Sequence, residues 1–102
     1  MAQREVIEIL KKYLLILKSE GIDIDKAYLY GSYLTETASD DSDIDLMLVT
    51  QNDDDYNAGK IWSLTRRVNT RIEPFLINTK KFQSNEESPL IQMIKTTGLE
   101  IV

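Results

Sequence analysis

The sequence predicts an α+β domain in which a small mixed β-sheet of three to four strands is flanked by helices. Helix-like and strand-like apolar patterns alternate along the chain, and no internal repeat or low-complexity tail interrupts them. The length of 102 residues suits one domain. We therefore expect residues 1–102 to fold as a single domain with an α/β-like order of elements.

The first half of the chain predicts one helix and two strands. Residues 3–18 carry apolar side chains at a period near 3.6, and Gly21 supplies the residue that ends this helix. Residues 27–30 form a short apolar strand, and residues 44–49 form a second one. The segment 32–42 is rich in Ser, Thr and Asp, which is typical of turns.

The middle of the chain predicts a second helix. Apolar residues recur at helical spacing over residues 58–68, and the aspartates at 53–55 are suited to cap its start. We expect Trp62, Tyr28 and Tyr30 to lie in the core.

The last third predicts a strand, a loop, a helix and a short final strand. Residues 71–77 read as a strand that must lie at a sheet edge or carry a bulge, because Pro74 cannot donate a ladder hydrogen bond. Residues 78–88 read as a polar loop. A helix then begins at Pro89, and residues 99–102 form the last short strand.

Composition excludes several classes of function. The chain has no His and no Cys, so imidazole-dependent triads, thiolate zinc sites and disulfides are all excluded. The formal net charge of −5 argues against direct binding of duplex DNA, which requires cations to neutralise phosphates. No apolar run is long enough for a membrane span, and the N-terminal residues do not resemble a signal peptide. We expect a cytoplasmic protein without a membrane contact.

Two carboxylates stand at the start of the second strand. Asp43 and Asp45 flank Ile44, so they point to the same face of the sheet, about 6.6 Å apart along the strand. Two such carboxylates repel each other unless a cation lies between them, and oxygen ligands without His or Cys favour Mg²⁺ or Mn²⁺. An EF-hand calcium loop is excluded, because its glycine and glutamate positions would be Leu46 and Asn52.

A glycine–serine pair precedes these carboxylates. Gly31 and Ser32 follow the first predicted strand, where a glycine allows close backbone approach to a phosphate and a serine offers its hydroxyl and N–H. Ten residues separate Ser32 from Asp43. This spacing would bring a phosphate site and a metal pair to neighbouring strand ends.

Residues 31–46 carry a resemblance to a known family. They read G-S-Y-L-T-E-T-A-S-D-D-S-D-I-D-L. This segment resembles the motif G-S-Y-A-R-G-E-A-S-x-D-S-D-I-D-L of the DNA polymerase β-like nucleotidyltransferases, and is most similar to their minimal, single-domain (MNT) group. Two departures stand out: Thr35 and Glu36 replace the motif's Arg-Gly, and Thr37 replaces its Glu.

The resemblance implies a set of site residues. Asp43, Asp45 and, on the third predicted strand, Glu73 would bind two Mg²⁺ ions and act in catalysis. Gly31, Ser32 and Ser42 would contact the nucleotide, which would be ATP.

The resemblance also implies an activity and a partner. The protein would transfer AMP from ATP to a hydroxyl acceptor, as an antitoxin that adenylylates a tyrosine of a HEPN-domain toxin. A second hypothesis is a non-catalytic module that neutralises the HEPN partner by forming a complex; a third is transfer to a small molecule such as an aminoglycoside. We expect either a homodimer or a hetero-oligomer.

Overall fold

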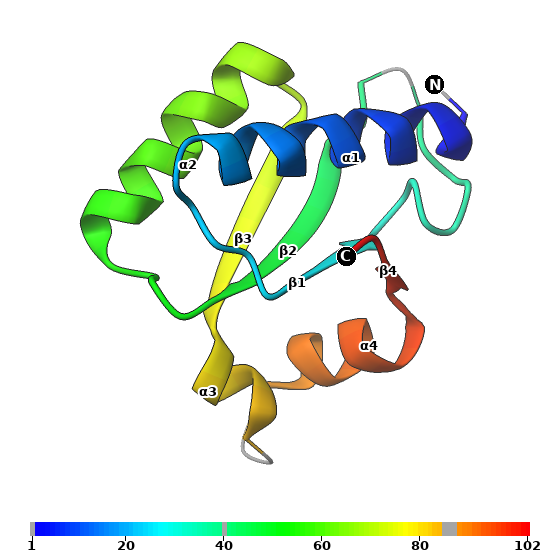
Figure 1. The fold of residues 1–102 in the computed structure, drawn as a ribbon. Coiled ribbons are helices and arrows are strands. Elements are labelled where there is room, and N and C mark those ends of the chain that lie inside the picture. Colours follow the sequence, from blue (N-terminus) through cyan, green and yellow to red (C-terminus); the bar gives the residue numbers. More distant parts are fainter. Residues whose placement is uncertain (1, 40, 85–87) are drawn as a thin grey trace.

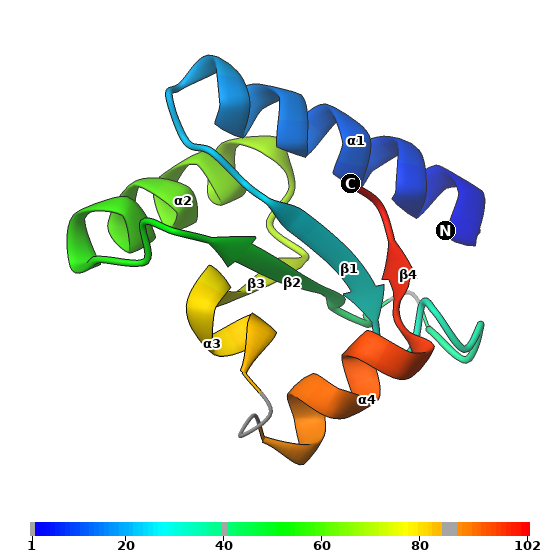
Figure 2. The ribbon, with the colours of Figure 1, turned by 60° about the horizontal axis from the view of Figure 1, so that its bottom comes forward.

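The computed structural model describes residues 2–39, 41–84 and 88–102. The order of elements is α1 (Gln3–Ser19), β1 (Lys26–Tyr30), β2 (Ile44–Thr50), α2 (Asp55–Val68), β3 (Ile72–Asn78), α3 (Thr79–Gln83), α4 (Pro89–Thr97) and β4 (Leu99–Glu100). The strands form one sheet, with α1 and α2 on one face and α3 and α4 on the other (Figures 1 and 2). The predicted α+β class with a mixed sheet of up to four strands is confirmed.

The strand order is β3-β2-β1-β4. Strand β1 pairs antiparallel with both β2 and β4, whereas β2 and β3 run parallel and are joined by α2. Strand β3 is therefore an edge strand, as the proline at position 74 predicted. The amino-terminal ends of β2 and β3 meet at one border of the sheet, and β1 ends at the same border.

The alternation of side chains along β2 divides its residues between two hydrophobic layers. Ile44, Leu46 and Leu48 point toward α1 and α2 and pack in one buried cluster. Met47 and Val49 point toward α3 and α4 and pack in the other. Asp45 therefore belongs to the face that α3 and α4 cover only in part.

A buried hydrogen bond links the two helices on the first face. The hydroxyls of Tyr13 in α1 and Thr65 in α2 are 2.7 Å apart, and Thr65 donates in turn to the carbonyl of Ile61. Burial raises the pKa of Tyr13 to about 12. The bond satisfies two polar groups that would be costly to bury alone.

The ends of the helices largely follow the sequence signals. After α1, Gly21 adopts a left-handed conformation with φ of 81°, as expected for the residue that ends a helix. Asp54 caps α2 by accepting a hydrogen bond from the N–H of Asn57 at 2.8 Å. Ser88 caps α4, in which Pro89 occupies the first turn.

Three expectations from the sequence are wrong, and two of them concern residues 79–83 and Trp62. Residues 79–83 form the short helix α3 instead of a loop, because Asn78 caps its start and Phe82 anchors it in the core. Trp62 is 39% exposed rather than buried, because it lies on the outer side of α2. The rest of the predicted loop at 85–87, like Asp40 of the motif, lies outside the described residues. In the part of the chain that is described, no helix could span a membrane.

Candidate active site

One row of polar side chains crosses three strands at the border where β1 ends. Tyr30 of β1 lies opposite Asp45 of β2, and Asp45 lies opposite Glu73 of β3. Residues opposite each other in a sheet share a face, with Cβ atoms about 5 Å apart. The structure thus brings together Asp45 and Glu73, which are far apart in sequence. We call Tyr30, Asp45 and Glu73 the acidic row.

Electrostatics show that the carboxylates act on one another. The pKa of Asp45 is raised by its partial burial and by the negative charges of Asp43 and Glu73. The pKa of Tyr30 is raised by burial and then by Asp45 and Glu73. Asp43 and Glu73 are exposed, whereas Asp45 is half-buried. The site is therefore a concentration of negative charge that is open to solvent on one side.

Tyr30 is the site residue that sequence reasoning missed. It was expected in the core, yet it is half-buried and its phenol lies near two carboxylates. The signal available in the sequence was its position. Tyr30 directly precedes Gly31, at the end of the strand that pairs with the strand carrying Asp45. The sequence does not state which residue of β2 it faces.

Gly31 lies directly against Asp45. Its φ of 80° is left-handed, and a Cβ at this position would collide with the Oδ2 and Cγ atoms of Asp45. Position 31 therefore requires glycine for two reasons, the backbone conformation and the space occupied by a carboxylate.

The turn after Gly31 is anchored to the rest of the domain. The side-chain amide of Gln3 donates to the carbonyls of Tyr33 and Leu34, both at 3.0 Å, and the ring of Tyr33 is buried. Ser32 is half-buried, and its hydroxyl has no hydrogen-bond partner among the described residues. The turn thus holds Ser32 in place while its hydroxyl stays available.

The hydroxyl of Ser42 is engaged within its own loop. It accepts a hydrogen bond from the N–H of Ser39 at 2.8 Å and lies 3.3 Å from the Ser39 hydroxyl. Ser42 therefore shapes the approach to Asp43, and its predicted contact with a nucleotide remains a prediction.

The turn after Gly31 contains the residues that depart from the motif. Glu36, at the motif's second glycine, adopts φ of 59°, a left-handed conformation that usually favours glycine. Thr35, at the motif's arginine, lies 2.8 Å from the hydroxyl of Thr37 and within 3.3 Å of the carbonyl of Ser32. The turn therefore carries no cationic side chain at the position of the motif's arginine.

The donor set fits a hard divalent cation. Asp43, Asp45 and Glu73 offer only carboxylate oxygens, which Mg²⁺ prefers. In residues 2–39, 41–84 and 88–102, no three acidic side chains converge closely enough to hold an ion. Asp43 and Glu73 are exposed, so packing does not fix their side chains in the orientations that the structure shows.

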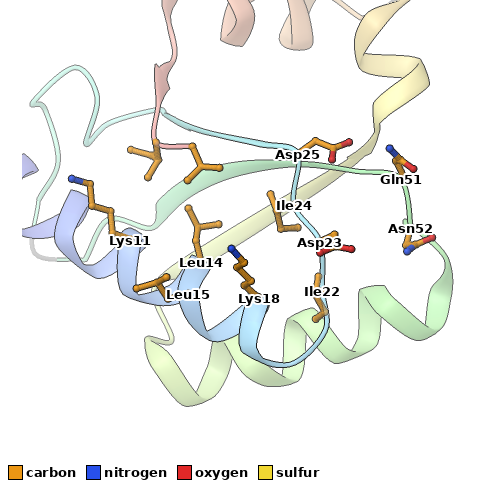
Figure 3. A pocket seen from close by; sticks show the side chains of 12 residues that line it. Lys11, Leu14, Leu15, Lys18, Ile22, Asp23, Ile24, Asp25, Gln51 and Asn52 are labelled. Carbon is orange, nitrogen blue, oxygen red and sulfur yellow. The ribbon is translucent and has the colours of Figure 1, made fainter.

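A groove of about 700 Å³ lies away from the acidic row (Figure 3). It is bordered by the carboxyl-terminal half of α1, the segment that follows α1, and residues 101–102. Leu14, Leu15 and Ile24 line it, with Lys11 and Lys18 at its α1 side. None of the predicted site residues lines this groove. The chemistry that the carboxylates can perform therefore belongs to the acidic row and not to this hollow.

A mixed sheet with carboxylates on neighbouring strands beside a glycine–serine turn defines a nucleotidyltransferase-like domain. A family model described as "Polymerase beta, Nucleotidyltransferase" matches residues 5–102. The chain therefore belongs to this family. No curated protein matches the chain significantly.

Solved structures share the fold. One is described as "a putative nucleotidyltransferase from Sulfolobus solfataricus", with 15% identity and a TM-score of 0.58, covering 79% of this chain and 74% of that chain. A toxin–antitoxin complex with AMP-PNP matches with 18% identity and a TM-score of 0.60, covering all of this chain and 73% of that chain. A mutant of the toxin–antitoxin pair MntA–HpeT matches with 14% identity and a TM-score of 0.55, again covering all of this chain and 73% of that chain.

Proposed function

We propose that this protein is an antitoxin that transfers AMP from ATP to a tyrosine hydroxyl of a HEPN-domain toxin. The observation that carries the proposal is the register that aligns Asp45 with Glu73, with Asp43 two residues before Asp45. The likeness to chains of toxin–antitoxin complexes, one of them with AMP-PNP, supports the partner class and the nucleotide.

The proposed reaction has two substrates, ATP and a tyrosine of the partner, and a side chain of the site accepts the proton that is released. The tyrosine oxygen of the partner attacks the α-phosphorus of ATP, forming an O–P bond as the bond from the α-phosphorus to the bridging oxygen breaks. Pyrophosphate leaves, and the phenolic proton passes to a carboxylate of the site, for which exposed Glu73 is suited. The N–H and hydroxyl of Ser32 would hold a phosphate beside Gly31.

Asp43, Asp45 and Glu73 would hold the divalent cations. Bound Mg²⁺ would supply charge neutralisation of the phosphates and a lower pKa for the attacking hydroxyl. Without cations, the three carboxylates would repel the triphosphate. Holding the cations is therefore the main task of the acidic side chains.

Intact mass spectrometry of the partner tests this proposal. A HEPN-domain toxin that co-purifies with this protein is incubated with ATP, Mg²⁺ and this protein, and we expect the toxin to gain about 329 Da per adenylyl group. Asp45→Asn should abolish the gain but still co-purify with the partner, because metal binding and docking are separate properties. Asp23→Asn, which removes an exposed carboxylate outside the site, is the matched control and should retain the gain.

A second function has a specific observation in its favour. Thr35 removes the motif's arginine from the turn, and Glu36 places a carboxylate one position earlier than the motif's Glu, which weakens a triphosphate site. A module that silences the partner by binding alone would form the complex with no change in mass. That result, equal for the wild type and Asp45→Asn, would exclude the transferase.

A further inference from the structure

The turn that follows β1 lacks the positive charge that a triphosphate requires. Residues 31–39 contain no Lys or Arg and include Glu36, and Asp41 and Asp43 follow. A nucleoside triphosphate held by Gly31 and Ser32 would meet hydrogen-bond donors there but no cationic side chain. Any side chain that neutralises the outer phosphates must come from another element of the fold.

The sheet register brings one arginine to this border. Ile44 of β2 lies opposite Ile72 of β3, and the N–H of Ile44 donates to the carbonyl of Arg71 at 2.7 Å. The parallel pairing thus extends one residue beyond the amino-terminal ends of β2 and β3, and this extension places Arg71 beside Asp43.

The same border carries Gly31 and Ser32. Strand β1 ends at Tyr30, which pairs with Asp45 of β2, and Gly31 lies directly against the Asp45 carboxylate. Ser32 follows in the turn, so this turn lies on the β1 side of β2 and Arg71 on its β3 side. A triphosphate held at Ser32 and an arginine side chain at position 71 would therefore approach each other from the two neighbours of β2.

Arg71 is held by its backbone while its side chain remains available. Its N–H donates to the side-chain oxygen of Asn69 at 2.8 Å, which fixes the approach to β3. The residue is half-exposed. Its guanidinium makes no ion pair or hydrogen bond with any residue that the structure describes, although Asp43 is its neighbour in register.

Other basic residues are less well placed. Arg66 and Arg67 lie in the last turn of α2, on the opposite face of the sheet from the acidic row. The ammonium of Lys60, also on α2, donates to the carbonyl of Glu20 at 2.7 Å. Position 71 directly precedes β3, and because its carbonyl continues the pairing with β2, the strand alternation continued by one residue places it on the same face as Glu73.

We propose that Arg71 is a phosphate-binding residue that pairs with the β- or γ-phosphate of the bound nucleoside triphosphate. From the position just before β3, it supplies the cation that the turn with Thr35 lacks. A guanidinium suits this task because it binds two phosphate oxygens at once and stays charged. This inference rests on the proposed function, because it requires a triphosphate substrate.

The test measures nucleotide affinity by calorimetry in the presence of Mg²⁺. We expect Arg71→Gln to weaken ATP binding at least tenfold and to leave AMP binding within twofold, because AMP lacks the outer phosphates. The ATP affinity of Arg71→Lys should fall between those of the wild type and Arg71→Gln, because lysine keeps the charge but cannot bind two phosphate oxygens in the same geometry. Arg67→Gln is the matched control and should bind ATP like the wild type.

A rescue variant adds a second criterion. Thr35→Arg in the Arg71→Gln background should restore most of the lost ATP affinity, because it returns a cation to the turn. Equal ATP affinity in Arg71→Gln and the wild type would overturn the inference and leave the transferase intact. So would an equal loss of ATP and AMP binding. A wild type that binds no ATP would overturn both the inference and the proposed function.

Discussion

One face of the sheet is apolar and buried at one end and polar and partly exposed at the other, although the same strands form both ends. Toward the middle of the sheet, Tyr28, Met47 and Ile77 alternate onto this face and are buried under α3 and α4. Two residues away along β1 and β2, and four residues away along β3, Tyr30, Asp45 and Glu73 occupy the same face. The strand period decides which residues share the face, and the coverage by α3 and α4 decides which of them meet water. The candidate site lies where the helical cover ends.

We call the part of this sheet face under α3 and α4 the covered end, and the part that carries the acidic row the open end. Substitutions should lower the free energy of unfolding at the covered end and not at the open end. We expect Met47→Ala to lower the free energy of unfolding by about 2–5 kcal/mol, because Met47 is fully buried and the truncation leaves a cavity. Glu73→Gln, on the same face but exposed, should change it by less than about 0.5 kcal/mol. Urea denaturation of both variants measures the difference. Equal losses would mean that the open end is as tightly packed as the covered end.

Divalent cations should stabilise the protein through the open end alone, because the carboxylates lie there. At ten times its dissociation constant, Mg²⁺ should add about 1.4 kcal/mol to the free energy of unfolding, which raises the melting temperature by several degrees. Asp43→Asn should abolish this rise in melting temperature. Met47→Ala should show the same rise, starting from a lower melting temperature. No shift in the wild type at millimolar Mg²⁺ would rule out the metal site.

The smallest expected effect concerns the charge of Asp45 in the absence of metal. Because its pKa is raised above the ordinary value of 3.8, the folded state binds the Asp45 proton more tightly than the unfolded state does. The wild type should therefore lose stability relative to Asp45→Asn as the pH rises from about 4 through the raised pKa. At neutral pH in EDTA, we expect Asp45→Asn to be more stable by up to about 1 kcal/mol. Thermal melts from pH 4 to pH 8 measure this, and a constant difference would contradict it.

Local patterns in the sequence predict most of the fold. The helical period of residues 3–18 and the apolar run after Asp45 are strong signals because burial enforces them. Helix α3 was missed because it has five residues and a single buried side chain, Phe82, which is too little for a periodic pattern. Trp62 was misplaced because an aromatic side chain at helical spacing does not show which side of the helix faces the sheet.

The candidate site was predictable only in part. The spacing from Gly31 to Asp45 is local and specific, so it pointed to those residues directly. The alignment of Glu73 with Asp45 depends on a parallel pairing between distant strands, which no short pattern specifies. The placements of Tyr30 and Arg71 follow from the same register, and so they could be recognised only after the topology was known.

Pro74 has a consequence beyond marking the edge of the sheet. An exposed edge strand is a template on which another chain can extend the sheet, which is a route to aggregation. Strand β3 is such an edge, but Pro74 has no N–H, and the charged Glu73 beside it is exposed. A strand approaching this edge would miss one hydrogen bond and would bring its neighbours close to a carboxylate. The edge strand that carries part of the acidic row is thus also protected against uncontrolled self-association.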